Sequence, residues 1–403
     1  MIRKLLSLLL FASPLAAICQ DITISAKVVD KETGAPLGYA SIGLRSVALG
    51  TISNSEGDFD FHMPDEYRND VLVVSMLGYK NFEAPVWSLS GRDQVIRMEK
   101  SPIILQEIVV SDTLRGQDIL EIALSRIEQN YPMQPFLLDG FYRDIKKVGG
   151  TYISLLEAAV KIYDDNYEEP RNKYKLREHV KLVEVRQSLG YESRFTTYFE
   201  QTNLLEDLLL QNNIRYRHFE DGEEVFSKME REKNSTYNDR EVYVISYHGE
   251  YYMKLLVDTQ DFSIIHFEFE QGFADDVLGR RQDLVSKFAS VKKQIDYRKF
   301  QGKMYPSFMS MTSKINWYDG ESNELKFETQ LFQQLLINHI NTHPTERIRS
   351  TEKMRNYGLQ FQDKPYNKTF WENYNVIKET PLDVEVVRDL EKHGPLKAQF
   401  EEP

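Results

Sequence analysis

The fold is decided by a stretch that begins ITISAKVVDKETGAPLGYASIGL (22–44), continues GTISNSEGDFDFHMP (50–64) and ends VLVVSMLGYKNFEAPV (71–86). From Ile22 to Val28, apolar residues alternate with polar ones, which is the period of a half-buried strand. Asn54 and Gly57 are the first and fourth residues of a tetrapeptide with the type I turn preference. Short strands with turn signals about every 8–12 residues predict a β-sandwich.

Three blocks of this stretch, PLGYASI, GTISNSEGDFDF and VSMLGYK, resemble the carboxypeptidase-regulatory-like domain, a small transthyretin-like β-sandwich. The usual Thr-Asp before the turn is Ser53-Asn54 here, which keeps the turn-capping chemistry. The module also stands at the N-terminus of TonB-dependent outer-membrane transporters. The resemblance implies a fold and an envelope setting but no peptidase activity, because the matching positions are turn and core residues. These positions are Gly34, Pro36, Leu37, Ala40, Gly50, Thr51, Gly57, Phe59, Ser75, Gly78 and Tyr79.

The first twenty residues have the order of a secretory signal peptide. Arg3 and Lys4 are followed by an apolar segment, 5–15, that is too short to span a bilayer. We expect residues 1–19 to be removed by cleavage before Gln20. Lipidation of Cys19 is an alternative, which the bulky Ile18 disfavours. Cys19 is the only cysteine, so the mature chain is expected to have no disulfide and no thiol nucleophile.

The net charge and the distribution of apolar residues limit the kinds of molecule that this protein is expected to bind. The formal net charge is −12, which argues against nucleic acid and anionic lipid surfaces as partners. No later stretch holds about 18 apolar residues in a row, so no transmembrane segment is predicted in the mature chain.

The length of 403 residues predicts two or three domains. The segment LQEIVVSD resembles the segment after the module in TonB-dependent transporters, but the rest of the chain lacks the repeated amphipathic strands of a large barrel. Asp112-Thr113-Leu114 resembles an acceptor for O-glycosylation at Thr113, and a plain linker is the alternative. The predicted divisions are a signal peptide at 1–19, the sandwich at 20–100, a linker at 101–115, a β-rich domain at 116–345 and a polar C-terminal segment at 346–403.

The β-rich domain is predicted to be antiparallel, with one or two helices. Residues 116–130 carry an apolar stripe at helical spacing that ends before Pro132, and residues 196–211 can form a second helix. In the C-terminal segment, Trp371 is expected to dock the chain on the domain, and residues 383–392 form a short helix. Alternating patterns predict strands at 136–146, 151–163, 180–189, 237–248, 251–258, 263–271, 288–300 and 303–316.

This layout of paired strands resembles the lipoprotein-carrier fold, an open half-barrel with helices on its concave face. The resemblance implies a concave apolar groove, the kind of surface where small ligands bind. The alternative is that the same side chains close an ordinary core without a cavity. The residues expected to line the groove are Leu120, Leu124, Ile127, Leu204, Leu205, Leu208, Phe267 and Phe269.

No motif identifies a catalytic, cofactor-binding or metal site. His339 and His343 are four residues apart, but they lack the zincin Glu, and Pro344 would end a helix there. Ser290 and Lys293 match S-x-x-K within a strand-like run and are interpreted as a chance match. The acid pairs at 164–165, 168–169 and 275–276 lack the spacing of a calcium loop, so solvated loops are expected.

The mainly β architecture and the absence of catalytic motifs predict a non-enzymatic exported binding or scaffolding protein of the cell envelope, in the periplasm or associated with the outer membrane. Its partner would be an envelope protein or an apolar ligand, and no cofactor is expected. One alternative is a carrier that holds an apolar ligand such as a lipid in a half-barrel groove. The other is a secreted hydrolase whose site residues are scattered along the sequence.

Overall fold

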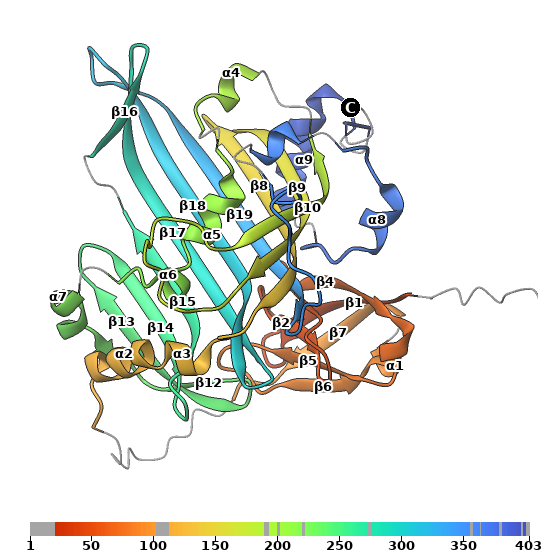
Figure 1. Ribbon diagram of the computed structural model, residues 1–403. Coiled ribbons are helices and arrows are strands. Elements are labelled where there is room, and N and C mark those ends of the chain that lie inside the picture. The colour runs from red at the N-terminus through yellow and green to blue at the C-terminus, as the bar shows by residue number, and fades with distance from the viewer. Residues whose placement is uncertain are drawn as a thin grey trace, which may run out of the picture.

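The computed structural model describes residues 21–89, 91–101, 113–188, 193–199, 202–219, 222–272, 276–354, 358–362, 364–378, 381–395 and 398–399 (Figure 1). Two predictions, the signal peptide with Cys19 and most of the linker, lie outside the described residues. The protein is mainly β, as the sequence predicts, with two small N-terminal sheets and one large antiparallel sheet.

The N-terminal module is a two-layer β-sandwich. In one layer β1 lies between β4, to which it is antiparallel, and β7, to which it is parallel; the other layer has the order β3-β2-β5-β6. Side chains from both layers form one core, in which Ile24, Phe59 and Phe61 are fully buried. The strands are β1 Asp21–Asp30, β2 Ser41–Leu44, β3 Gly50–Ile52, β4 Asp58–Pro64, β5 Val71–Ser75, β6 Phe82–Pro85 and β7 Gly91–Met98, with a short 3-10 turn η1 at Asp65–Tyr67 and a helical turn α1 at Val86–Leu89.

The predicted turn forms as expected at the start of β4. The Asn54 side-chain oxygen accepts hydrogen bonds from the backbone amides of Glu56 and Asp58, both at 2.9 Å. Gly57 has a φ of +80°, and a Cβ there would lie 2.4 Å from the backbone oxygen of Val28. Only glycine fits this position without strain, which explains why the motif carries it.

The large sheet has twelve strands, and it is open because the strand order ends at β10 on one side and at β11 on the other. The order is β10-β9-β8-β19-β18-β17-β15-β14-β13-β11, with β12 on β13 and β16 on β17. All its pairings are antiparallel. The strands are β8 Phe136–Val148, β9 Thr151–Asp164, β10 His179–Gln187, β11 Glu230–Arg231, β12 Ser235–Tyr237, β13 Arg240–His248, β14 Tyr252–Asp258, β15 Ile264–Gln271, β16 Val277–Arg281, β17 Leu284–Phe300, β18 Lys303–Asp319 and β19 Leu325–Asn341.

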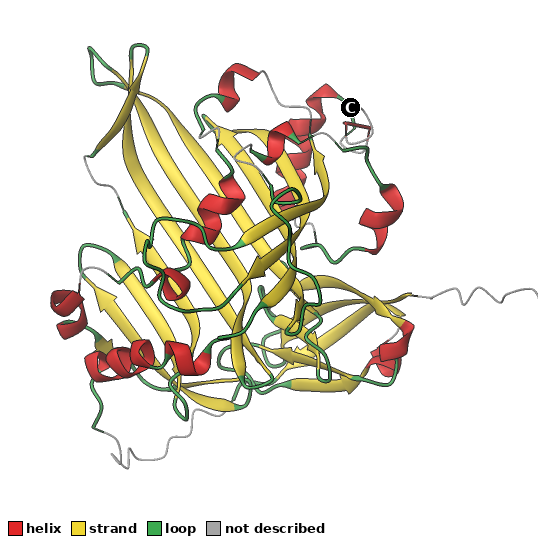
Figure 2. Ribbon diagram, in the orientation of Figure 1, coloured by secondary structure: helices red, strands yellow, loops and turns green. Residues whose placement is uncertain are grey.

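Helices and helical turns cover one face of this sheet, which we call the helical face (Figure 2). Ile119 and Leu120 from α2 and Leu205 and Leu208 from α5 are buried there against apolar strand residues such as Phe267. The predicted first helix is divided in two near Arg126. The predicted helix at 196–211 is observed in part, because residues 204–210 are helical whereas residues 197–199 and 202–203 are not. These elements are α2 Gly116–Ser125, α3 Ile127–Asn130, α4 Ser193–Thr196, α5 Leu204–Leu210, α6 Asn213–Tyr216 and α7 Gly222–Ser227.

The C-terminal segment packs on the opposite face, which we call the outer face (Figure 1). Trp371 is buried against Phe141 of β8, and Arg186 of β10 lies over its ring at 4.4 Å. Val386 and Leu390 pack on β8 and β9 nearby. The expected docking through Trp371 and the expected short helix are therefore present. The elements are η2 Leu359–Phe361, α8 Lys368–Asn373, α9 Pro381–Leu390 and η3 Glu391–His393.

The sandwich contacts the large sheet through its β2–β3 turn. The backbone oxygen of Ala48 accepts hydrogen bonds from the Ile340 amide at 3.1 Å and from the Arg298 guanidinium at 2.7 Å. Leu49 forms an isolated antiparallel bridge with His339. Ala48 is 4% exposed and belongs to the core of the large sheet, so the two regions share buried surface.

Candidate ligand-binding cavity

A cavity of about 380 Å³ lies between α6, α7 and the neighbouring strands of the large sheet. Strands β14, β15 and β17 form its floor, and side chains from residues 211–219 and 222–226 form its roof. Its lining residues are Tyr174, Gln211, Asn213, His218, Phe219, Gly222, Val225, Phe226, Tyr251, Met253, Phe269, Gln271, Val291 and Lys293.

The strand register places three of these side chains in one row across the floor. Met253 of β14 is opposite Phe269 of β15, and Phe269 is opposite Lys293 of β17. Directly paired residues on adjacent strands point to the same face of a sheet, so all three face the cavity. Tyr251 packs on Phe269 with ring centroids 5.0 Å apart. This row is therefore apolar at Met253 and Phe269 and basic at Lys293.

Lys293 supplies the only ammonium group among the described residues that line this cavity. It is 8% exposed. Its Nζ donates to the Asn213 side-chain oxygen at 2.6 Å, and it contacts the side-chain and backbone oxygens of Gln211 at 3.3 and 3.4 Å. Removal of the charged form from water lowers the pKa of Lys293 to about 8. All three partners are neutral, so the charge has hydrogen bonds but no counter-ion among them.

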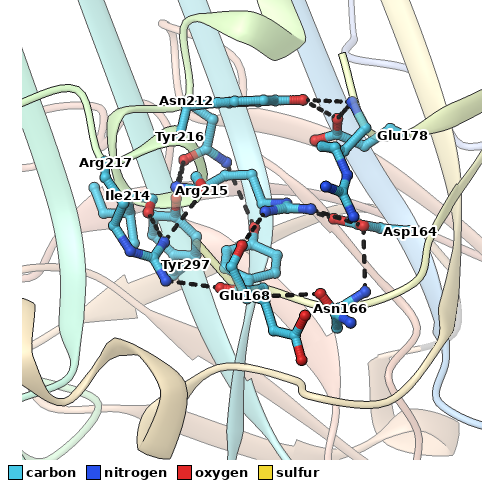
Figure 3. A network of polar contacts seen from close by, with 12 residues as sticks. Asp164, Asn166, Glu168, Glu178, Asn212, Ile214, Arg215, Tyr216, Arg217 and Tyr297 are labelled. Carbon is cyan, nitrogen blue, oxygen red and sulfur yellow. Dashed lines mark hydrogen bonds and ion pairs between the residues drawn. The ribbon is translucent and has the colours of Figure 1, made fainter. Parts of the chain in front are cut away.

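The roof is held in place by a buried polar network below α6 (Figure 3). Arg215 is fully buried, and its Nε and Nη2 donate to the two carboxylate oxygens of Asp164 at 2.6 and 3.0 Å. Its Nη1 donates to the backbone oxygen of Glu168 at 3.0 Å. A bidentate pair of this kind fixes the orientation of the guanidinium group as well as balancing its charge. Asn213, two residues earlier, is thereby held above the sheet.

Two further contacts complete this network. The Asn212 side-chain oxygen caps α6 by accepting from the Arg215 amide at 3.0 Å, and it also accepts from the Tyr297 hydroxyl of β17. The Tyr216 hydroxyl donates to Glu178, whose pKa is raised to about 7 by burial and by the nearby charge of Asp164. The roof is thus tied to the sheet on both sides of Asn213.

Sequence reasoning missed the buried charged groups of this region. Lys293 was considered only as part of a chance S-x-x-K match. It lies between Val291 and Ile295 on one face of β17, and a lysine at such an apolar position could have indicated a buried ammonium group. The expectation of a solvated loop is wrong for Asp164, which is 2% exposed. No local pattern marks this aspartate, because its partner Arg215 is distant in sequence.

The residues predicted to line a groove lie in two environments. Leu120, Ile127, Leu205, Leu208 and Phe267 are buried in the core between the helices and the sheet. A cavity of about 10 Å³ in the same region is lined by other residues, among them Tyr167 and Leu209, and it has room for at most one water molecule. Of the remaining three, Leu204 is buried, Leu124 is half-buried and Phe269 lines the cavity.

The other sequence candidates are not among the residues that line this cavity. Thr113 is exposed, and its glycosylation stays a prediction. His339 lies in β19 and contacts Asp139 at 3.2 Å, whereas His343 lies beyond the strand. In the described part of the chain, no group of three or more His, Cys, Asp or Glu side chains is arranged to hold a metal ion. Within the same residues, no helix combines the length and apolar character that a membrane crossing requires.

Comparison with known proteins identifies the N-terminal module. Residues 24–110 match the family model of the CarboxypepD_reg-like domain, which confirms the predicted resemblance. The chain matches no curated protein.

Solved structures similar to the chain include a LolA superfamily protein from Nitrosomonas europaea, with 18% identity, a TM-score of 0.21, and coverage of 58% of this chain and 96% of that chain. A DUF1329 family protein from Desulfovibrio piger has 9% identity and a TM-score of 0.24, over 58% of this chain and 93% of that chain. The MucA/MucB complex of Pseudomonas aeruginosa has 10% identity and a TM-score of 0.18, over 55% and 93%. TM-scores this low carry no argument about the function of this chain.

Proposed function

We propose that this chain is a non-enzymatic binding protein of the cell envelope, and that its large sheet holds a small ligand with apolar surface in the cavity between α6, α7 and β14, β15 and β17. The observation that carries the proposal is the cavity itself. Its volume of about 380 Å³ falls in the range of roughly 300–1,000 Å³ that small-molecule sites occupy. A dry apolar cavity of about 150 Å³ already binds benzene.

The lining supports binding of an apolar group. Phe219, Phe226 and Phe269 are only half-buried although they border the sheet core. Burying the remaining exposed surface of an aromatic side chain is favourable in free energy. A ligand that fills the space would supply that burial, with a few polar groups at one end to fix its orientation.

The same lining supports binding rather than catalysis. General acid–base catalysis most often uses a histidine, or else a group such as a carboxylate, and nucleophilic catalysis often uses a serine or cysteine within reach of a base. The described residues that line the cavity include one histidine and no Asp, Glu, Ser, Thr or Cys. The histidine, His218, contacts the backbone oxygen of Lys173 at 3.0 Å and stacks between Tyr174 and Tyr216, which is a packing role.

The proposal is tested by filling the cavity. Val291 is half-buried at the cavity wall, so Val291→Trp adds an indole to the space. The measurement is binding of the neutral fluorescent probe N-phenyl-1-naphthylamine to the full chain. We expect the wild type to bind at micromolar concentration and Val291→Trp to lose about tenfold or more in affinity.

The matched control is Val277→Trp, because Val277 is 55% exposed on β16 and is not among the cavity residues. It should bind the probe as the wild type does. If the wild type binds no probe, and protein purified from its host carries no apolar adduct in native mass spectrometry, the cavity has no carrier role. An envelope interaction module would then be the function that remains.

A further inference from the structure

We propose that the ligand is an anionic amphiphile with one negative charge, and that Lys293 binds its head while the tail lies over Phe269 and Met253. This inference rests on the proposed function and specifies the chemical class of the ligand. It starts from the position of the lysine, at the basic end of a row whose other two side chains, Phe269 and Met253, are apolar.

The charge of Lys293 is not balanced by the acids on neighbouring strands. Glu268 and Glu270 flank Phe269 in sequence, and alternation along β15 turns both to the outer face. There Glu268 pairs with His266 at 2.9 Å and Glu270 with Lys292 at 3.4 Å. No described carboxylate pairs with Lys293 itself. A buried cation without a counter-ion is costly, and an anion that enters the same cavity would relieve that cost.

A ligand oxygen could replace some of the present contacts of Lys293. The bond to Asn213 is short at 2.6 Å, but the two contacts to Gln211, at 3.3 and 3.4 Å, are longer than an optimal hydrogen bond. A ligand oxygen at about 2.8 Å would form a charge-assisted bond in place of these weak contacts. Asn213 would remain bound and keep the ammonium group aimed at the cavity.

The cavity indicates the charge and direction of the ligand. One ammonium beside neutral amides suits a monoanion such as a carboxylate, whereas a phosphomonoester carries nearly two charges at neutral pH. From Lys293 the row crosses β15 at Phe269 and reaches β14 at Met253, a distance of about 10 Å at the usual strand spacing. Phe219 and Phe226 from the roof face the same space. An extended alkyl tail fits this path.

The experiment compares three ligands of one chain length on the full protein. Dodecanoate, the neutral dodecanol and dodecyl phosphate compete with N-phenyl-1-naphthylamine at neutral pH. We expect dodecanoate to bind about tenfold or more tightly than dodecanol, because only the carboxylate can form a charge-assisted hydrogen bond with an ammonium group. Dodecyl phosphate should bind no better than dodecanoate. A clear preference for the phosphate would contradict the monoanion.

Two variants separate recognition from a structural role. Lys293→Met should lose the preference for dodecanoate and keep its affinity for dodecanol, whereas loss of both ligands would mean that Lys293 only ties the roof to the sheet. Lys292→Met is the control, because Lys292 is exposed and pairs with Glu270 on the outer face. Equal binding of dodecanoate and dodecanol by the wild type would overturn this inference and leave the proposed function intact. If the wild type binds neither the ligands nor the probe, the proposed function itself fails.

Discussion

His266 shows how single residues on the outer face of the large sheet differ from those on the helical face. Its ring nitrogens contact Asp296 and Glu268, and the side chain is 13% exposed. Burial alone would lower the pKa of His266, but the charges and hydrogen bonds of the two acids outweigh burial and raise it to about 9. On the helical face, burial acts on Lys293 without a counter-ion and lowers its pKa. The pKa is therefore raised for His266, which has acidic partners on the outer face, and lowered for Lys293, which has only neutral partners on the helical face.

The pKa of His266 predicts a pH-dependent stability. Because the folded-state pKa is raised from 6.5 to about 9, the folded state binds a proton that the unfolded state releases. The stabilisation is complete below pH 6.5 and is lost as the pH rises toward 9. The free energy of unfolding should therefore fall as the pH rises. We expect this fall to be smaller in His266→Gln than in the wild type, by an amount on the order of 1–3 kcal/mol.

The measurement is urea unfolding of wild type and His266→Gln at pH values below 6.5 and above 9. Other groups also titrate across this range, so the comparison rests on the difference between the two proteins. The two curves should converge at high pH. Parallel curves, with the same gap at both ends, would mean that His266 contributes through packing alone.

At the level of elements, several strands were predicted close to their observed bounds. The predicted strands at 136–146, 151–163 and 303–316 correspond to β8, β9 and β18. Strand β19 was not predicted, although it joins β18 to β8 at the centre of the sheet. The reason is visible in its residues: Gln333 and Gln334 are both buried, on opposite faces. Buried glutamines erase the alternation on which the prediction depends.

The partners of these glutamines are distant in the sequence. Gln333 donates to the Tyr142 hydroxyl at 2.9 Å and to the backbone oxygen of Leu204 at 2.7 Å. Buried amides are tolerated when such partners exist, but both partners are distant in the chain. The same holds for Arg215 with Asp164, so the polar part of the candidate site was not predictable from local pattern.

The C-terminal segment gives a prediction at this scale. Trp371 of α8 is 5% exposed, and it packs between Phe141 of β8 and Arg186 of β10. Trp371→Ala should lower the free energy of unfolding by about 3–5 kcal/mol, as large-to-small changes of buried aromatic residues do. Denaturant unfolding followed by circular dichroism measures this loss.

Trp87→Ala is the matched control, because Trp87 is 58% exposed and its removal should change stability by no more than about 0.5 kcal/mol. If Trp371→Ala is as stable as the control, the segment from Lys368 to Asn373 does not stabilise the sheet. Docking of the tail would then be incidental to the fold.

For the whole molecule, the parts were predictable from sequence but their arrangement was not. The module was recognisable because its turns and core lie within one stretch of chain. Its docking on the large sheet involves pairs far apart in sequence, such as Ala48 with Ile340 and Leu49 with His339, and these residues are of no distinctive type. The division of the chain into domains at 20–100 and 116–345 remains a prediction. The buried contact around Ala48 allows a test of whether the two regions fold independently.

The last prediction is that residues 21–99 fold without the rest of the chain. The core of the sandwich closes within this span, where Ile24, Phe59, Phe61, Leu72 and Val74 are all fully buried. A domain of about 80 residues buries enough surface to fold alone. We therefore expect the fragment to unfold in one cooperative transition, measured by circular dichroism on heating.

Ala48→Asp separates folding of the module from its docking. In the full chain Ala48 is 4% exposed within the core of the large sheet, so a buried carboxylate there should destabilise the protein by several kcal/mol. In the fragment the large sheet is absent, so the new carboxylate would face water and the transition should move little. A fragment without a cooperative transition, or one that Ala48→Asp unfolds, would show that the sandwich and the large sheet fold as one unit.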